Sequence, residues 1–224
     1  MPGRPGAAGR RDAGDCILAL RPPSGGRFVY HPLHMATGRD SIFLIGPMGS
    51  GKSAVGRQLA RKLGMPFFYS DNEIERRTGV DIPMIFEREG EDGFRRREHD
   101  VIAELAGRER IVLATGGGAV LDPENRHHLA GCGWVVYLET SVTQQVERAG
   151  RTRHRPLLQG VDPAQRLQEL LRIREPLYRE IADYTISTNR RRVPQVVDRI
   201  AQAYAAARAP FAAPAPPAPA PPAD

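Results

Sequence analysis

The sequence has few cysteines, few aromatic residues and no long apolar run. Its two cysteines, Cys16 and Cys132, lie far apart, and no histidine stands at the spacing of a metal site. A disulfide framework and a zinc centre are therefore not expected, and a reducing compartment, the cytoplasm, fits. No stretch approaches the roughly eighteen apolar residues that a membrane-spanning helix needs, so we expect no membrane partner.

Lysine is also scarce, although the chain is basic. Of the 32 basic side chains only Lys52 and Lys62 are lysines, and the formal net charge is +6. The arginines are scattered among acidic residues and aromatics make up only 6% of the chain, which is not the pattern of a nucleic-acid-binding surface. We therefore expect small anionic substrates and no nucleic acid. Because the sequence otherwise uses arginine for its basic residues, Lys52 is a stronger candidate for a functional residue.

The composition divides the 224 residues into a central region and two ends. Residues 1–39 are rich in Gly, Pro and Arg and are expected to form a flexible extension, with Met35 as a candidate native start. Residues 209–224 are an Ala/Pro run that cannot build a core, so a disordered tail is expected there. The central region, 40–208, has the length of one domain.

Short apolar runs alternate with helical periodicity in the central region. This alternation predicts an α/β fold in which a five-stranded parallel sheet is covered by helices on both faces. Strands are expected at 42–45, 67–69, 111–114, 134–138 and 184–187. Helices are expected from the end of the glycine-rich segment to Leu63, and at 72–78, 82–89, 92–107, 123–130, 142–148, 163–178 and 194–208.

The segment from Gly46 to Ser53, GPMGSGKS, matches the phosphate-binding pattern GxxxxGK[ST] and stands between an apolar strand and an amphipathic helix. Its glycines let backbone N–H groups approach phosphate oxygens, and the helix N-terminus adds partial positive charge. Lys52 would reach the β- and γ-phosphates, and Ser53 would place its hydroxyl on Mg²⁺. The pattern leaves open whether the protein transfers phosphate to a substrate, hydrolyses a nucleotide as a switch, or drives a motor.

Two other predicted strands also end in residues suited to a ligand site. The second is followed by Ser70-Asp71, and the third by Thr115-Gly116-Gly117-Gly118. Ligands of doubly wound sheets bind beyond the carboxyl ends of the strands. Asp71 is a base near the γ-phosphate, the N-cap of the helix expected at 72, or both. The three glycines either make a tight turn or let a ligand approach bare backbone amides.

Six segments in a fixed order resemble the shikimate kinases. They are GPMGSGK, SDNEIERRTG, GEDGFRRRE, LATGGG, RPLL at Arg155 and REPLY at Arg174, within residues 40–204. The resemblance implies a P-loop kinase-type three-layer fold with a mobile lid at about 149–162. It also implies a monomer that uses ATP and Mg²⁺ to phosphorylate the 3-hydroxyl of shikimate, on the route to chorismate and the aromatic amino acids.

The resemblance also implies which residues bind the acceptor. Asp71 would hold the acceptor hydroxyls and act as the base, and Arg95 and Arg174, with the backbone of Gly117 and Gly118, would hold the shikimate carboxylate. Glu98 follows Arg95 by three residues, shares its helical face and would orient its guanidinium. Without the resemblance, Arg95, Arg96 and Arg97 would be typical of a solvated charged face.

The nucleotide site implied by the resemblance extends beyond the glycine-rich segment. Arg155, in the lid, would swing over the transferring phosphate and complete a catalytic set with Lys52 and Asp71. Arg148 would stack on adenine, with the loop at 192–194 on the other side of the ring. The expected ATP ligands are Gly49, Ser50, Gly51, Lys52, Ser53, Ala54, Arg148 and Arg155.

One position departs from the family pattern. The family usually has an aspartate two residues before Asp71, which reaches Mg²⁺ through water, and this chain has Tyr69 there. A tyrosine cannot supply that charge, so either the Mg²⁺ shell is completed elsewhere or metal affinity and rate are reduced.

Two alternatives remain beside shikimate phosphorylation, and Tyr69 supports the second of them. One is a P-loop kinase for gluconate or a nucleoside monophosphate; the monophosphate would give the two arginines no carboxylate to hold. The other is a nucleotide-binding regulatory or scaffold protein without catalysis.

Overall fold

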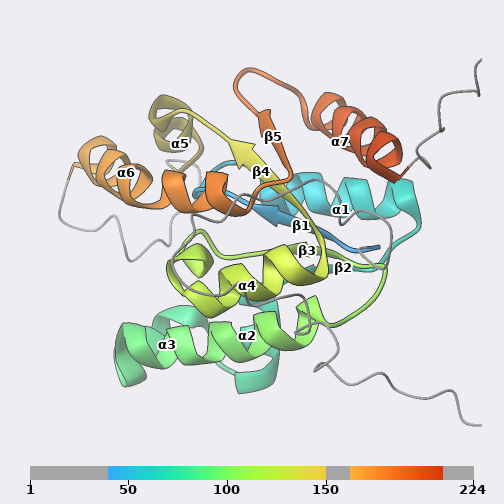
Figure 1. Ribbon diagram of the computed structural model, residues 1–224. Helices are drawn as coiled ribbons and strands as arrows, with labels where there is room; N and C mark the ends of the chain where they lie inside the picture. Colours follow the sequence, from blue (N-terminus) through green and yellow to red (C-terminus); the bar gives the residue numbers. More distant parts are fainter. Residues whose placement is uncertain (1–39, 150–161, 209–224) are drawn as a thin grey trace, which may run out of the picture.

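A computed structural model describes residues 40–149 and 162–208. Within them, a five-stranded parallel sheet lies between layers of helices (Figure 1). The strands are β1 (Ile42–Ile45), β2 (Phe67–Tyr69), β3 (Val112–Ala114), β4 (Trp134–Glu139) and β5 (Tyr184–Ser187), in the order β2-β3-β1-β4-β5. The expected parallel sheet is confirmed. The predictions for 1–39, for 209–224 and for nearly all of the lid fall outside the described residues.

Each expected helix is present. The bounds are α1 Lys52–Leu63, α2 Ser70–Thr78, α3 Ile82–Ala106, α4 Pro123–Cys132, α5 Val142–Ala149, α6 Pro163–Ile181 and α7 Val193–Arg208, with a short 3-10 turn, η3, at Ala119–Leu121. The helices expected at 82–89 and 92–107 meet at Gly90, whose φ of 70° and ψ of −174° are not helical. Among the described helices, none has the length and apolar character needed to cross a bilayer.

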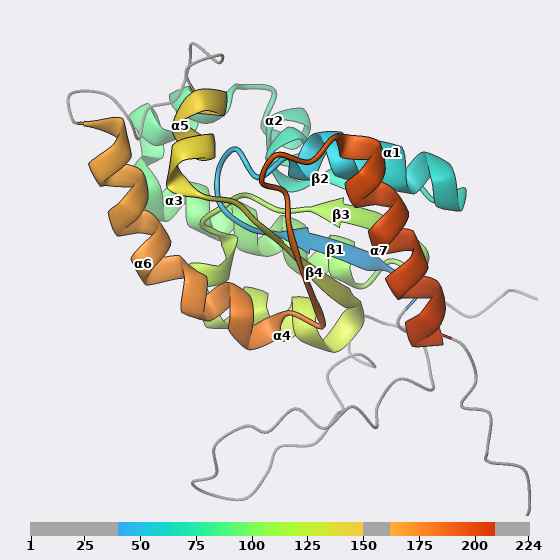
Figure 2. The same ribbon diagram turned by 90° about the horizontal axis from the view of Figure 1, so that it is seen from above.

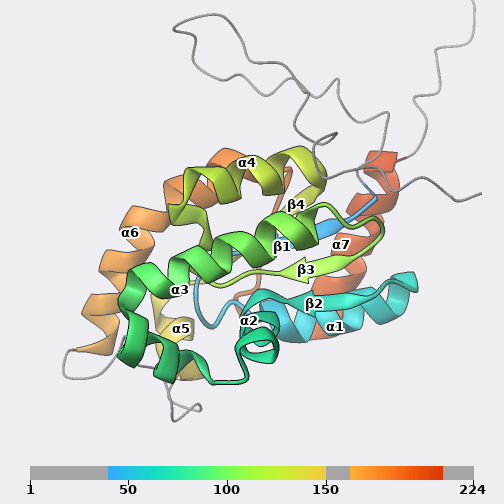
Figure 3. The ribbon, with the colours of Figure 1, turned by 90° about the horizontal axis from the view of Figure 1, so that it is seen from below.

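Alternate residues of the central strands enter two different cores. Ile42 and Leu44 of β1 pack with α1 and α7, as Figure 2 shows for that face of the sheet. Phe43 and Ile45 point the other way, toward α3, α4 and α6 (Figure 3). The period of two follows from the pleat of a strand, and burial on both faces explains why β1 is continuously apolar.

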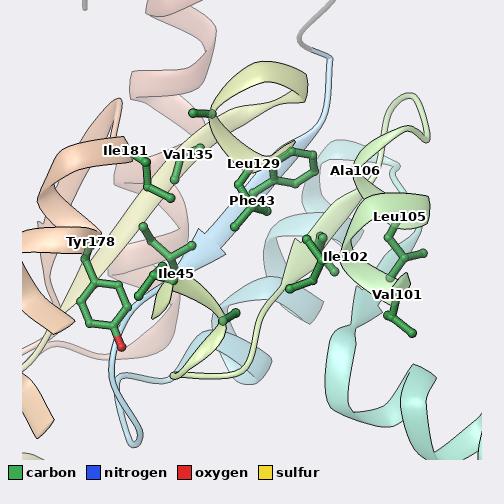
Figure 4. Close-up of a cluster of buried hydrophobic side chains, with 14 of the residues drawn as sticks. Phe43, Ile45, Val101, Ile102, Leu105, Ala106, Leu129, Val135, Tyr178 and Ile181 are labelled. Carbon is green, nitrogen blue, oxygen red and sulfur yellow. The ribbon is translucent and has the colours of Figure 1, made fainter. Parts of the chain in front are cut away.

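The core on the second face joins the sheet to the helices that carry the acceptor site. Figure 4 shows Phe43 and Ile45 among side chains from α3, α4 and α6, including Tyr178. Phe43, Ile45 and Tyr178 are each 0% exposed, and burial of each large apolar side chain contributes about 1.5–3 kcal/mol. The packing therefore fixes α3 and α6 against the same strands.

The strand order places three segments side by side. β3 pairs with β2 on one side and with β1 on the other, and all three strands run in the same direction. The segments that follow them therefore leave from the same edge of the sheet. They are the glycine-rich segment after β1, the first turn of α2 with Asp71 directly after β2, and the three glycines after β3.

Candidate active site

The segment 46–53 has the backbone of a phosphate-binding loop. The φ angles of Gly46, Gly49 and Gly51 are 138°, 77° and 93°, in a region that favours glycine. A Cβ on Gly46 would also lie 2.6 Å from the carbonyl oxygen of Leu138. Helix α1 begins directly after Gly51, so its first N–H groups, which have no acceptor within the helix, open toward the loop. Such a terminus is suited to an anion.

Lys52 lies inside this loop. Its ammonium group donates to the carbonyl oxygens of Gly46 at 2.7 Å and of Pro47 at 2.9 Å, and the residue is 7% exposed. Ser50 is buried too, and its hydroxyl has no hydrogen-bond partner within the described part of the chain. The loop thus holds its lysine within reach of any phosphate that it binds.

A cavity of about 640 Å³ opens beside the loop. Its walls come from the glycine-rich segment and the first turn of α1, from the end of β2 and α2, from the glycines after β3, from both parts of α3, and from one arginine each of α5 and α6. The predicted site residues that line it are Gly49, Gly51, Lys52, Ser53, Ala54, Asp71, Arg95, Gly117, Gly118, Arg148 and Arg174. Ser50 is not among its lining residues, and Arg155 lies outside the described residues.

Asp71 lies in the first turn of α2. The residue before the helix is Tyr69, which has extended backbone angles, so the interpretation of Asp71 as the N-cap is wrong. Its Oδ2 accepts a hydrogen bond of 2.8 Å from the Tyr69 hydroxyl, and its Oδ1 accepts one of 3.1 Å from the Ser70 hydroxyl. Ser70 Oγ in turn accepts from the N–H of Gly116 at 2.9 Å. These bonds tie the carboxylate to the end of β3.

Arg95 is held by two carboxylates of its own helix. Its Nη1 donates to Glu98 Oε2 at 2.6 Å and its Nη2 to Glu91 Oε1 at 2.8 Å. The expectation that Glu98 orients Arg95 is confirmed. The alternative of a solvated face is wrong for Arg95, whose side chain is 23% exposed, and holds for Arg96. Burial opposes the charge on Arg95, but the two carboxylates outweigh it and raise its pKa.

Glu98 is a fully buried carboxyl group. Burial raises its pKa to about 7, because Arg95 only partly offsets the desolvation and Asp71 adds like charge. Glu98 Oε1 has no hydrogen-bond partner within the described residues. A Cβ on Gly116 would come within 2.5 Å of this oxygen. Glycine at 116 is therefore what leaves room for Glu98.

Arg174 is a buried cation on the cavity wall. It is 8% exposed, and no carboxylate of the described residues lies within ion-pair distance of it. Burial lowers its pKa, and the charge of Arg95 lowers it further. A desolvated guanidinium is costly unless an anion accompanies it. This side chain is therefore suited to an anionic ligand of the cavity.

The glycines after β3 form a turn, because Leu121 N–H donates to Gly118 O at 2.9 Å. They also give room to Arg95, since a Cβ on Gly118 would lie 2.5 Å from Arg95 Nη2. The approach of a ligand to their backbone amides stays a prediction. Gly117 O accepts a hydrogen bond from the hydroxyl of Tyr178, which fixes α6 against the turn. Sequence reasoning missed Tyr178, although its spacing of four from Arg174 places both on one helical face.

Arg148 ties the phosphate loop to Thr188, the residue that follows β5. Its Nη1 donates to Gly49 O at 2.7 Å, and its Nη2 donates to Gln144 Oε1 at 2.8 Å and to Thr188 O at 3.2 Å. Arg148 lines the cavity, whereas the loop at 192–194 is not among the lining residues. The stacking of Arg148 on adenine stays a prediction.

The cavity offers oxygen donors suited to Mg²⁺. The Ser53 hydroxyl and the Asp71 carboxylate line the same space as the phosphate loop. Mg²⁺ prefers oxygen ligands and is often held by one or two protein groups together with substrate phosphates and water. No group of three or more His, Cys, Asp or Glu side chains that could hold a metal occurs in the described residues. The donor set thus fits a cation that arrives with a nucleotide.

The fold and site together define a class of protein. A parallel sheet with the order β2-β3-β1-β4-β5, a phosphate loop after its central strand and an acceptor cavity beside that loop are those of a P-loop kinase. A family model described as shikimate kinase matches residues 48–205. The chain belongs to the shikimate kinase family.

Individual relatives agree with this assignment. The chain is 63% identical to the shikimate kinase of Methylococcus capsulatus over 166 residues, which are 74% of this chain and 93% of the relative. It is 58% identical to that of Thioalkalivibrio sulfidiphilus over 168 residues, 75% of this chain and 88% of the relative. Among solved structures, the shikimate kinase of Acinetobacter baumannii in complex with shikimate superposes with a TM-score of 0.73 at 50% identity, covering 79% of this chain and 98% of the other.

Proposed function

We propose that this protein transfers the γ-phosphoryl group of ATP to the 3-hydroxyl of shikimate, giving shikimate 3-phosphate and ADP for chorismate and aromatic amino-acid biosynthesis. Membership of the shikimate kinase family supports the reaction. The observation that carries the choice of an acceptor with a carboxylate is Arg174, a buried guanidinium that lines the cavity and has no carboxylate partner among the described residues. The carboxylate of shikimate would supply that partner.

The nucleotide would be held by the loop at 46–53. Backbone N–H groups of Gly49 to Ala54 would bind the phosphates, and Lys52 would leave its carbonyl partners for the β- and γ-phosphates. Mg²⁺, with Ser53 as a ligand, would neutralise phosphate charge when bound. Arg148 would contact the adenine. Arg155 and the lid at about 149–162 would close over the phosphates and exclude water.

The acceptor would be held at the other end of the cavity. Arg95 and Arg174 would grip its carboxylate, with the backbone of Gly117 and Gly118 alongside, and Glu98 would keep Arg95 in place. The acceptor oxygen would attack the γ-phosphorus as the bond to the bridging oxygen of ADP breaks. Asp71 would orient the attacking hydroxyl and receive its proton.

The proposal includes the oligomeric state, the cellular location and the partners of the protein. We expect the enzyme to act as a monomer in the cytoplasm, where ATP and Mg²⁺ are abundant. Its partners would be ATP and shikimate, without nucleic acid or membrane. The scattered distribution of its arginines among acidic residues supports a role with small anions.

A coupled assay of ADP release tests the activity. Release should require shikimate, and should be weak with gluconate or without an acceptor. Equal release with gluconate would overturn the proposed acceptor, and no release with any acceptor would favour a binding protein without catalysis. Sensitivity to the concentration of Mg²⁺ should appear in the same assay.

The role of Asp71 has its own test. Asp71→Asn should keep ATP binding and lose about 10²–10⁴-fold in kcat, because the amide cannot take the proton. Asp198→Asn is a matched control, since Asp198 pairs with Lys62 on the surface of α7. An unchanged kcat in Asp71→Asn would remove Asp71 from the mechanism.

A further inference from the structure

Tyr69 is in direct contact with the proposed base. It is the last residue of β2, it lines the cavity together with Asp71, and its hydroxyl donates a hydrogen bond of 2.8 Å to Asp71 Oδ2. Its ring packs at the edge of the core between the sheet and helices α1 and α7. The residue therefore has two separable parts, a ring that packs and a hydroxyl that reaches the site.

The Asp71 carboxylate depends on its neighbours for a fixed orientation. The χ2 torsion of aspartate has a broad, roughly two-fold distribution, so local torsional preference does not hold the carboxylate plane. In this chain the Ser70 hydroxyl contacts Oδ1 at 3.1 Å and the Tyr69 hydroxyl contacts Oδ2 at the shorter distance of 2.8 Å. Bonds from a hydroxyl to an ionised carboxylate are among the stronger hydrogen bonds in proteins. The Tyr69 hydroxyl is thus the closer of the two contacts that hold the group.

The two bonds leave the carboxylate able to act. An ionised carboxylate has about four lone-pair sites, and Ser70 and Tyr69 occupy two of them. The remaining sites can meet an acceptor hydroxyl in the cavity. Because the Ser70 hydroxyl also accepts a hydrogen bond from the N–H of Gly116, the Asp71 carboxylate is held in a fixed position relative to the end of β3.

We propose that Tyr69 is a positioning residue, whose hydroxyl holds Oδ2 of Asp71 so that the carboxylate meets the acceptor hydroxyl in one orientation. This inference rests on the role of Asp71 proposed above. It differs from a packing role, because the ring alone would serve the core. It also differs from replacement of a charged metal ligand, because a neutral phenol adds no negative charge.

The hydroxyl can be removed without the ring. Tyr69→Phe should lower kcat about 10- to 100-fold, since a displacement of the reacting group by about 1 Å can cost that much. The KM values for shikimate and ATP should stay within a factor of about two of the wild-type values. Neither the arginines that would hold the carboxylate, Arg95 and Arg174, nor the phosphate loop is altered. Tyr204→Phe is the matched control: it also loses one hydroxyl hydrogen bond, to the carbonyl of Asp40, far from the cavity. That variant should keep wild-type kinetics.

A double-variant cycle then asks whether Tyr69 acts through Asp71. In an Asp71→Asn background, Tyr69→Phe should change the rate by less than about two-fold, because coupled residues are not additive. Single-turnover measurements with enzyme in excess allow the rate of phosphoryl transfer to be measured even for the slow variants. An equal loss from Tyr69→Phe in both backgrounds would overturn the inference. So would a Tyr69→Phe enzyme that behaves like Tyr204→Phe while Asp71→Asn is severely impaired. If Asp71→Asn itself is unimpaired, the proposed role of Asp71 fails first.

Discussion

Replacement of Glu98 by glutamine should remove a strong pH dependence from the folding stability. The pKa of this buried carboxyl group is raised from 4.5 to about 7. In that window the folded protein keeps the proton that the unfolded chain has lost. The contribution of Glu98 to stability is therefore complete below pH 4.5 and is lost as the pH rises to about 7. Glutamine fills nearly the same volume and does not titrate.

The size of the effect follows from the shift. Each pKa unit corresponds to about 1.4 kcal/mol, so a rise from 4.5 to about 7 corresponds to about 3–4 kcal/mol. The free energy of unfolding of the wild type, minus that of Glu98→Gln, should fall by this amount across the window. Other titrating groups cancel in the difference, because both proteins contain them.

Urea unfolding at a series of pH values, from below 4.5 to above 7, measures this difference. Glu91→Gln is a control, because Glu91 also contacts Arg95 but has a side chain that is 56% exposed. That variant should change stability by less than about 1 kcal/mol throughout. A wild-type minus Glu98→Gln difference that is flat, or that rises with pH, would refute the reasoning.

Three further variants test other parts of the structure. Lys52→Met should raise the KM for ATP and lower kcat, with a loss of about 10²-fold or more in kcat/KM; unchanged ATP kinetics would exclude Lys52 from phosphate binding. Arg174→Ala should raise the KM for shikimate far more than that for ATP, since truncating one side of a buried charge pair costs about 2–5 kcal/mol. Equal effects on both KM values would contradict the proposal that Arg174 holds the carboxylate of shikimate. Gly56→Ala would place a Cβ 2.3 Å from the ring of Phe67 and should lower stability by about 1–3 kcal/mol in urea unfolding, and an increase in stability would show that the ring has room to move.

The sheet was predictable because its strands are buried on both faces. β1, for example, is IFLI with every residue at 0% exposure, so its apolar run stands out without any alternation. The break in α3 was predictable too, because Gly90, with its positive φ, lies between the helices expected at 82–89 and 92–107. The start of α2 was less predictable: it was expected at 72, and the helix begins at Ser70, directly after β2.

The site was predictable where the chemistry is local in sequence. The phosphate loop is one continuous segment, and Glu98 lies one helical turn from Arg95, so spacing alone indicates that the two side chains meet. The contact of Arg148 with Gly49 O joins residues far apart in the chain and has no local signal. Tyr69 was interpreted as a lost charge. Its hydrogen bond to Asp71 could not be inferred, because the chain changes from strand to helix between the two residues.

The sheet also sets the distance between the group that gives phosphate and the group that receives it. Val112 of β3 pairs with Ile42 of β1 on one side and with Phe67 of β2 on the other. A slip of β3 by one residue would carry the glycine turn about 3.3 Å along both neighbours. The hydrogen bonds between the strands therefore fix the distance between the phosphate loop after β1 and Asp71 after β2. Side-chain motion in the cavity can adjust the reacting groups only around that distance.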